Sequence, residues 1–171
     1  MRIKYTVDIS DIVAFNQFHL DTSPLVRKQR IKMLVFAALV YGAVALLMAS
    51  GKHSIYNVSV FVIVYAGFLF WYLRYGRKAN VKRITRIYAG GKNTGIFGEH
   101  ELELLPDGIR EVTSVNEHVT KFSGIERVEA TETHVFVFFS SLSAYVIPKS
   151  KISEGSVDAF VAALRGNIHP Q

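Results

Sequence analysis

The sequence predicts a membrane α-helical hairpin joined to a small α+β domain of antiparallel strands that ends in a helix. Three observations support this fold class. Two long uncharged runs occupy residues 33–51 and 54–73. Short segments that alternate apolar and polar residues follow from Thr94, and an amphipathic segment lies near 156–165. Alternation with period two is typical of strands, whereas apolar spacings of three and four are typical of helices.

Both uncharged runs have the length of a membrane span. A helix needs roughly 20 apolar residues to cross a hydrocarbon core about 30 Å thick, and each run supplies them. Lys52 and His53 are the residues between the runs. Because this connection is so short, residues 31–75 are expected to form two transmembrane helices with an outer loop near 51–54.

Lysine and arginine flank the hairpin at its two open ends. One cluster lies within residues 27–32 and another within 74–83, while the outer loop carries only Lys52. Because segments rich in Lys and Arg stay on the cytoplasmic side, both termini are predicted to be cytoplasmic. The chain is therefore expected to be a multi-pass protein of the cell inner (plasma) membrane.

The basic residues continue into a predicted juxtamembrane linker at 76–93. Residues 74–92 contain seven Lys or Arg and no acid, whereas residues 93–171 contain six basic and eleven acidic residues. A nucleic-acid-binding domain should be the basic part of a chain, so nucleic acid is disfavoured as a partner despite a net charge of +6. The lipid bilayer is the expected partner instead. The residues predicted to contact lipid head groups, here called the basic collar, are Arg74, Arg77, Lys78, Lys82 and Arg83.

A stripe of small residues runs along the first span. Small side chains let helices approach closely in lipid, where apolarity alone does not drive association. Packing of the stripe against the second span is the favoured interpretation, and a homo-oligomer contact is the alternative. The members of this small-residue stripe are Ala38, Gly42, Ala45 and Ala49.

Residues 1–30 are predicted to form a cytoplasmic strand followed by an amphipathic helix. Residues 2–7 alternate as a strand, and Asp8 or Ser10 can cap a helix over roughly 11–20. This helix carries an acidic residue and no Lys or Arg, unlike helices that lie on membrane surfaces. It is therefore expected to pack against the C-terminal domain. Whether the strand joins the C-terminal sheet is left open by the sequence.

Residues 94–168 are predicted to form the cytoplasmic antiparallel domain. Several short strands joined by tight turns indicate a small sandwich or barrel. Ser156 can cap the last helix, in which Phe160 and Leu164 share one apolar face. Strands followed by one terminal amphipathic helix are the element order of a pleckstrin-homology-like (PH-like) domain.

Three segments of this domain read LLPDGIREVT, FSGIERV and YVIPKSKI. Together with the strand, helix, basic segment and hairpin before them, they resemble the YcxB-like family of bacterial membrane proteins. The resemblance covers nearly the whole chain, through the order of its elements. It implies a two-span hairpin with a PH-like C-terminal domain, and it implies no catalytic residues.

No spacing of nucleophiles, acids or metal ligands indicates an enzyme. The histidines are scattered, and His100-Glu101 lacks the second histidine of a zinc-binding helix. Three acids with period two, at Glu99, Glu101 and Glu103, are expected on the solvated face of a strand. His100 and His134 are expected to be structural residues. The protein is therefore expected not to be an enzyme and to require no cofactor or metal.

The predicted function is that of an integral inner-membrane protein whose PH-like domain binds a protein or lipid partner. Two alternatives remain open: a regulatory subunit of a membrane transporter or enzyme, and a homo-oligomeric membrane organiser that assembles through the small-residue stripe. Neither uncharged run has an ionisable residue at its centre. Transporters normally carry one there, so transport by this chain itself is disfavoured.

Overall fold

A computed structural model of the chain describes residues 1–48, 54–91 and 93–168, and these divide into two units. The β unit comprises Met1–Asn16 and Thr85–Gln171, and the helical unit comprises Gln17–Ile84. The helical unit is thus inserted into the chain between two parts of the β unit. Most of the predicted outer loop, and Ala49 of the small-residue stripe, lie outside the described residues.

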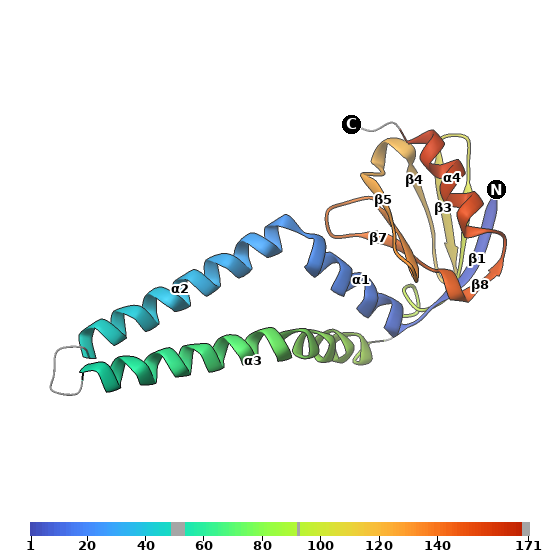
Figure 1. Ribbon diagram of the computed structural model, residues 1–171. Helices are drawn as coiled ribbons and strands as arrows, with labels where there is room; N and C mark the ends of the chain where they lie inside the picture. The colour runs from blue at the N-terminus through green and yellow to red at the C-terminus, as the bar shows by residue number, and fades with distance from the viewer. Residues whose placement is uncertain (49–53, 92, 169–171) are drawn as a thin grey trace. The chain divides into compact units, whose positions relative to one another are not determined.

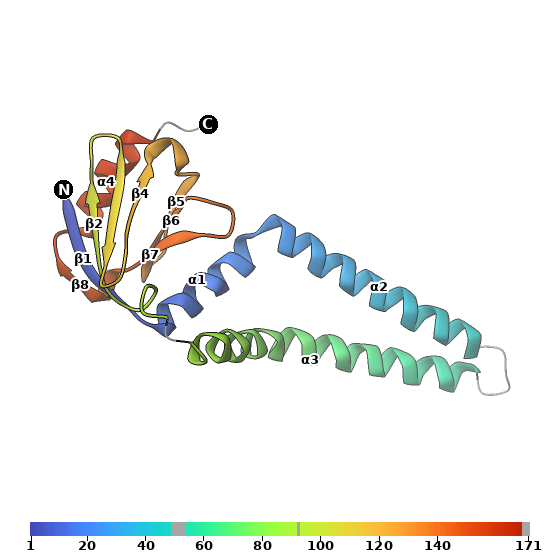
Figure 2. The same cartoon turned by 180° about the vertical axis from the view of Figure 1, so that it is seen from behind.

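The described part of the β unit contains two antiparallel sheets (Figures 1 and 2). The first has the strand order β4-β3-β2-β1-β8, and the second has the order β5-β6-β7. Their bounds are β1 Arg2–Val7, β2 Gly98–Leu104, β3 Gly108–Thr113, β4 Glu117–Lys121, β5 Arg127–Ala130, β6 His134–Phe138, β7 Ala144–Pro148 and β8 Ile152–Glu154. Two 3-10 turns, η1 (Phe122–Gly124) and η2 (Lys149–Lys151), carry the chain from one sheet to the other and back. The expected domain of short antiparallel strands is confirmed.

Strand β1 lies inside the five-stranded sheet, between β2 and β8. Its register pairs Ile3 with Leu102 and Tyr5 with His100. The inward side chains of β1 belong to the core, since Ile3, Tyr5 and Val7 are at most 3% exposed. The N-terminal strand therefore does join the C-terminal sheet, and the fold that contains residues 94–168 also contains residues 2–7.

Strand β8 is too short to show an alternating pattern, so the sequence does not predict it. It pairs with β1 on the side opposite β2. Gly155 follows with φ +87°, a conformation that suits glycine. A Cβ atom there would lie 2.4 Å from the carbonyl oxygen of Arg2. Glycine at this position thus lets the chain leave β8 while passing close to β1.

Helix α1 (Ile9–Thr22) begins two residues earlier than predicted because Asp8 and Asp11 form a reciprocal cap. The Asp8 carboxylate accepts a hydrogen bond from the Ser10 backbone N–H at 2.7 Å, and the Asp11 carboxylate accepts one from the Asp8 N–H at 2.8 Å. Beyond this cap, the Phe15 ring centroid lies 5.6 Å from that of Phe136. The part of this helix that belongs to the β unit therefore packs on the second sheet.

Helix α4 (Val157–Asn167) closes the β unit, and its start agrees with the prediction. The Ser156 hydroxyl accepts a hydrogen bond from the Ala159 backbone N–H at 3.4 Å, as an N-cap residue does. Phe160 and Leu164 are fully buried, and Val161 is nearly so. Figure 1 shows α4 beside the end of the sheet at which the chain begins.

The helical unit contains α2 (Pro24–Met48) and most of α3 (Ser54–Ala89). Pro24 occupies the first position of α2, where its missing N–H costs nothing. Helix α3 continues well past the apolar run, so the predicted juxtamembrane linker is helical as far as Ala89. Just after it, the Asn93 side-chain amide donates a hydrogen bond to the carbonyl oxygen of Tyr88 at 2.7 Å.

Replacing Phe160 with Asp is expected to destabilise the β unit by about 3–5 kcal/mol, because a charge would enter a fully buried site. Ala162→Asp on the same helix is the matched control, since Ala162 is exposed. Hydrogen exchange of β1 and β2 amides in the full-length protein measures the effect. Equal protection in the two variants would contradict the docking of α4 described above.

Candidate functional site

Aromatic side chains form the described contact between α2 and α3. The ring centroids of Tyr41 and Tyr65 lie 5.3 Å apart, and the Tyr65 hydroxyl donates a hydrogen bond to the carbonyl oxygen of Leu34 at 3.3 Å. In the small-residue stripe, by contrast, Ala38 and Gly42 are exposed and Ala45 is half-buried. For Ala38 and Gly42, the interpretation as a packing face within the hairpin is therefore wrong.

The outer faces of the two helices are strongly apolar. Segments Val26–Leu47 and Val58–Gly76 are long and apolar enough to cross a membrane, and both are unburied within the protein. Large hydrophobic side chains are exposed along them, including Leu39, Leu46, Leu47, Ile63, Phe70 and Trp71. A soluble monomer rarely exposes contiguous apolar surface of this kind, which agrees with membrane association.

The basic residues gather at one end of the helical unit. Helices α2 and α3 run antiparallel, and they diverge toward the end of the unit at which α2 begins (Figure 1). Toward that end, the Arg30 guanidinium lies 5.9 Å from the Tyr72 ring centroid. Within the basic collar, Arg74, Lys82 and Arg83 are exposed, and the side chains of Arg77 and Lys78 lie outside the described residues.

The basic collar is spread along the axis of a helix. With a rise of 1.5 Å per residue, Lys82 lies about 9 Å beyond Gly76, the last residue of the apolar segment. That distance is close to the Debye length of about 8 Å at physiological ionic strength. An exposed charge at Lys82 is thus about one screening length from the end of the apolar segment.

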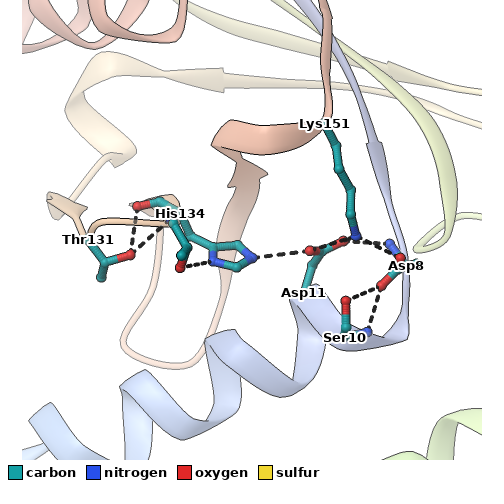
Figure 3. Close-up of polar contacts among 7 residues, drawn as sticks. Asp8, Ser10, Asp11, Thr131, His134 and Lys151 are labelled. Carbon is teal, nitrogen blue, oxygen red and sulfur yellow. Dashed lines mark hydrogen bonds and ion pairs between the residues drawn. The ribbon is translucent and has the colours of Figure 1, made fainter.

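A polar cluster in the β unit joins α1 to the second sheet (Figure 3). Asp11 is 2% exposed, and its carboxylate accepts a hydrogen bond from Lys151 Nζ at 2.8 Å. Its other oxygen lies 3.1 Å from His134 Nε2, which donates the hydrogen bond. Lys151 Nζ also lies 2.7 Å from Asp8. These contacts tie the first turn of α1 to β6 and η2.

Two groups of this cluster have shifted pKa values. The pKa of the Asp8 carboxyl is held well below its usual range by hydrogen bonds from Lys151 and then Ser10. Burial opposes the charge of Lys151, but its hydrogen bonds to Asp11 and Asp8 outweigh this and raise its pKa. The stability that the lowered pKa of Asp8 contributes is lost as the pH falls below about 4. The stability that the raised pKa of Lys151 contributes is lost as the pH rises above about 10.4. The ion pair between Asp8 and Lys151 is thus intact throughout the neutral range.

The same cluster contains a hydroxyl, an imidazole and a carboxylate in series. Thr133 Oγ1 lies 2.8 Å from His134 Nδ1, and His134 in turn contacts Asp11. Such a series can activate a nucleophile when the carboxylate serves the imidazole. Here the carboxylate is also the ion-pair partner of Lys151. We therefore assign the cluster to holding α1 in place.

Glu101 and His100, also considered from the sequence, have partners within the β unit. Glu101 lies on the outer face of the five-stranded sheet, where it pairs with Arg2 at 3.4 Å and Lys4 at 3.5 Å. His100 has partners at both ring nitrogens, Glu111 at 2.9 Å and the Ile96 carbonyl oxygen at 3.1 Å. Within the described ranges no three His, Asp or Glu side chains are grouped as metal ligands. Ion pairing of Lys151 with Asp8 and Asp11 was not predicted, because the residues are far apart in sequence.

The chain thus combines an antiparallel β sandwich with a pair of long apolar helices that carry basic residues at one end. Within it, residues 104–164 match the family model described as YcxB-like protein, which confirms the resemblance to the YcxB-like family. The match extends from the end of β2 into α4 and leaves out β1 and the helical unit. No curated protein and no solved structure matches the chain.

Replacing Lys151 with Gln is expected to lower the free energy of unfolding of the β unit by roughly 2–4 kcal/mol, because the buried Asp11 carboxylate loses its ammonium partner. Lys149→Gln in the same 3-10 turn is the control, since Lys149 has no ion pair among the described residues. Hydrogen exchange of the amides of the first turns of α1 is the measurement. If both variants exchange alike, the cluster does not hold α1.

Proposed function

We propose that this chain is an integral membrane protein of the inner (plasma) membrane, in which α2 and α3 cross the bilayer as a hairpin. Support comes from the two apolar segments of sufficient length and from their exposed apolar faces. The Lys and Arg residues at one end of the helical unit agree with the cytoplasmic side of such a hairpin. The exposed rings of Trp71 and Tyr75 suit the interface at that end.

One observation constrains on which side of the membrane the two ends of the chain lie. Strand β1 precedes the hairpin in the chain, strand β2 follows it, and the two strands pair over the whole of β1. Paired strands must lie on the same side of a membrane. The chain between them must therefore cross the bilayer an even number of times, which two spanning helices do. Both termini are then on the same side of the membrane, and the basic residues indicate that this is the cytoplasmic side.

The β unit is proposed to be the PH-like part that binds a protein or lipid partner without catalysing a reaction. Two antiparallel sheets followed by a helix at one end support this comparison with PH-like domains. Capture from membranes with chemical crosslinking in mild detergent would identify such a partner. A regulatory subunit of a transporter or enzyme would instead be recovered with that larger complex.

A homo-oligomeric organiser is a second candidate, and one observation favours it. Ala38 and Gly42 are exposed on α2, and a Cβ added at Gly42 would meet nothing within 4 Å. Two copies of α2 could therefore approach closely along this stripe. Gly42→Leu should then abolish crosslinking between copies and leave the β unit folded. Unchanged crosslinking would remove this candidate.

The topology predicts a specific pattern for reporter fusions. Fusions after Arg30 and after Gln171 should report the cytoplasm, and an insertion at His53 should report the outside. Because β1 pairs with β2, the fusions at the two ends of a folded β unit cannot report opposite sides of the membrane. A periplasmic signal from the C-terminal fusion alone would contradict the even number of crossings, and periplasmic signals from both end fusions would contradict the orientation.

The basic collar is expected to interact with anionic lipid. Each Lys or Arg near an anionic leaflet contributes on the order of 1 kcal/mol. Protease cleavage at Gly90-Gly91 in wild-type protein should be slower in anionic than in neutral vesicles, because the preceding helix is held at the surface. Substitution of Lys78, Lys82 and Arg83 by Gln should abolish this difference and leave insertion intact.

High salt is the control for this experiment, since it screens exposed charges and should reproduce the effect of the substitutions. Equal cleavage of the wild type in both vesicles would mean that the basic collar sets topology and does not bind lipid.

A further inference from the structure

A small cavity of about 60 Å³ lies within the helical unit, among its three helices. Gln17, Leu20 and Asp21 line it from α1, Arg30 lines it from α2, and Asn80 lines it from α3. The three residues of α1 have spacings of three and four, so they share one face of that helix. The cavity lies toward the end of the unit at which α2 and α3 diverge (Figure 1). None of its lining residues belongs to the basic collar.

A glycine keeps the wall on α3 open. Tyr72, Gly76 and Asn80 follow one another at intervals of four residues and therefore lie along one face of α3. This face is directed toward α2 and the cavity, since Tyr72 contacts Arg30 and Asn80 lines the cavity. A Cβ added at Gly76 would meet nothing within 4 Å. The wall is thus bare between an aromatic ring and a carboxamide, and a large side chain at position 76 would reach into this space.

The cavity lies at the depth of lipid head groups if α3 spans the bilayer as proposed above. Gly76 is the last residue of the apolar segment Val58–Gly76. With a rise of 1.5 Å per residue, Asn80 lies about 6 Å beyond it. The head-group layer on each side of the hydrocarbon core is roughly 5–8 Å thick. An occupant of the cavity would therefore be a polar head group and not an acyl chain.

The wall carries one full charge of each sign. Arg30 provides a guanidinium, whose planar fork of N–H donors suits the oxygens of a phosphate. Asp21 provides a carboxylate, which accepts several hydrogen bonds and so can bind an ammonium beside its contacts within the protein. The side-chain amides of Gln17 and Asn80 add two further oxygens. A primary ammonium has three N–H donors, one for each of these three groups.

The volume limits the cationic part of an occupant. A water needs roughly 10–15 Å³ of such a cavity, so about 60 Å³ holds roughly four to six atoms of that size. An aminoethyl group, with two carbons and one nitrogen, fits within this volume. A trimethylated ammonium would fill the cavity to its limit and would offer no N–H to the three acceptors. The cavity therefore favours a primary ammonium.

We propose that this cavity binds the phosphoethanolamine head group of a membrane lipid, with the phosphate at Arg30 and the primary ammonium at Asp21 and the two side-chain amides. The inference rests on the proposed membrane function, because the lipid reaches the cavity only if α2 and α3 span the bilayer. Such a head group has no net charge, which matches a wall with one acid and one base. In this respect the site differs from the basic collar, whose expected partner is an anionic leaflet.

Bilayer nanodiscs that contain the full-length protein test the proposal. The discs hold equal amounts of phosphatidylethanolamine, phosphatidylcholine and phosphatidylglycerol, and native mass spectrometry after extraction in mild detergent counts the lipids retained on the protein. Phosphatidylethanolamine should be retained about tenfold more than either of the others, the effect of one hydrogen bond to a charged group. Stepwise N-methylation of the ethanolamine should lower its retention step by step. Free phosphoethanolamine should leave the lipid bound, and displacement of the lipid would mean that the ligand is a soluble compound.

Matched pairs of variants separate the contacts. Arg30→Gln should lower retention of phosphatidylethanolamine about tenfold. Arg27→Gln should not lower it, since this change removes an equal charge from an exposed residue of α2 that does not line the cavity. Asp21→Asn should abolish the preference for phosphatidylethanolamine over phosphatidylcholine, because the ammonium loses its counter-charge. Gly76→Leu should exclude the head group, whereas Gly67→Leu, at an exposed glycine of α3 with equally open space, should not.

The site and the membrane function are tested separately. Flotation of vesicles that carry the protein measures insertion, and its failure would contradict the membrane function on which the site depends. Insertion with equal retention of the three lipids would contradict the site alone, and so would preferential retention of phosphatidylglycerol. Equal effects of Arg30→Gln and Arg27→Gln would mean general attraction by positive charge and would also overturn the proposal. Undiminished retention in Gly76→Leu would place the lipid elsewhere on the protein.

Discussion

The pairing of β1 with β2 is the constraint on which the rest of the structure depends. These strands are separated in sequence by the whole helical unit, yet they pair along the entire length of β1. Closing so long a connection costs conformational entropy, which rises slowly with length. The antiparallel arrangement of α2 and α3 returns the chain and reduces that cost. One requirement thus governs both the core of the β unit and the antiparallel return of the chain through α2 and α3.

The buried polar groups of the β unit fall into two kinds. Asp11 is satisfied by Lys151, His134 and a backbone N–H, and such a network is stable because each buried charge has partners. The hydroxyl of Tyr5, on β1, has no hydrogen-bond partner among the described residues. The first kind holds α1 against the sheet. The second is a buried hydroxyl, and the lack of a partner lowers the stability of the β unit.

The division of charge between the units also has a physical reason. Basic residues are concentrated at one end of the two apolar helices, whereas acids predominate in the β unit. On the five-stranded sheet these acids are largely neutralised across strands, since Arg2 and Lys4 each contact Glu101 and Glu154. Such exposed pairs contribute little stability individually. They do prevent like charges from meeting on neighbouring strands, so the sheet tolerates a row of acids on its outer face.

The sequence by itself determined the elements whose signal is local: two apolar helices, the alternation in β2, the Ser156 cap of α4 and the basic clusters. Each depends on residues within a few turns of one another, and periodicity and charge report them directly. Only the tertiary structure decided that β1 lies between β2 and β8 and that Lys151 pairs with Asp11. These contacts join residues far apart in the chain, and no local pattern encodes which strands become neighbours. The exposure of Ala38 and Gly42 was also decided by the tertiary structure, because α2 and α3 contact each other through aromatic rings and not through these small residues.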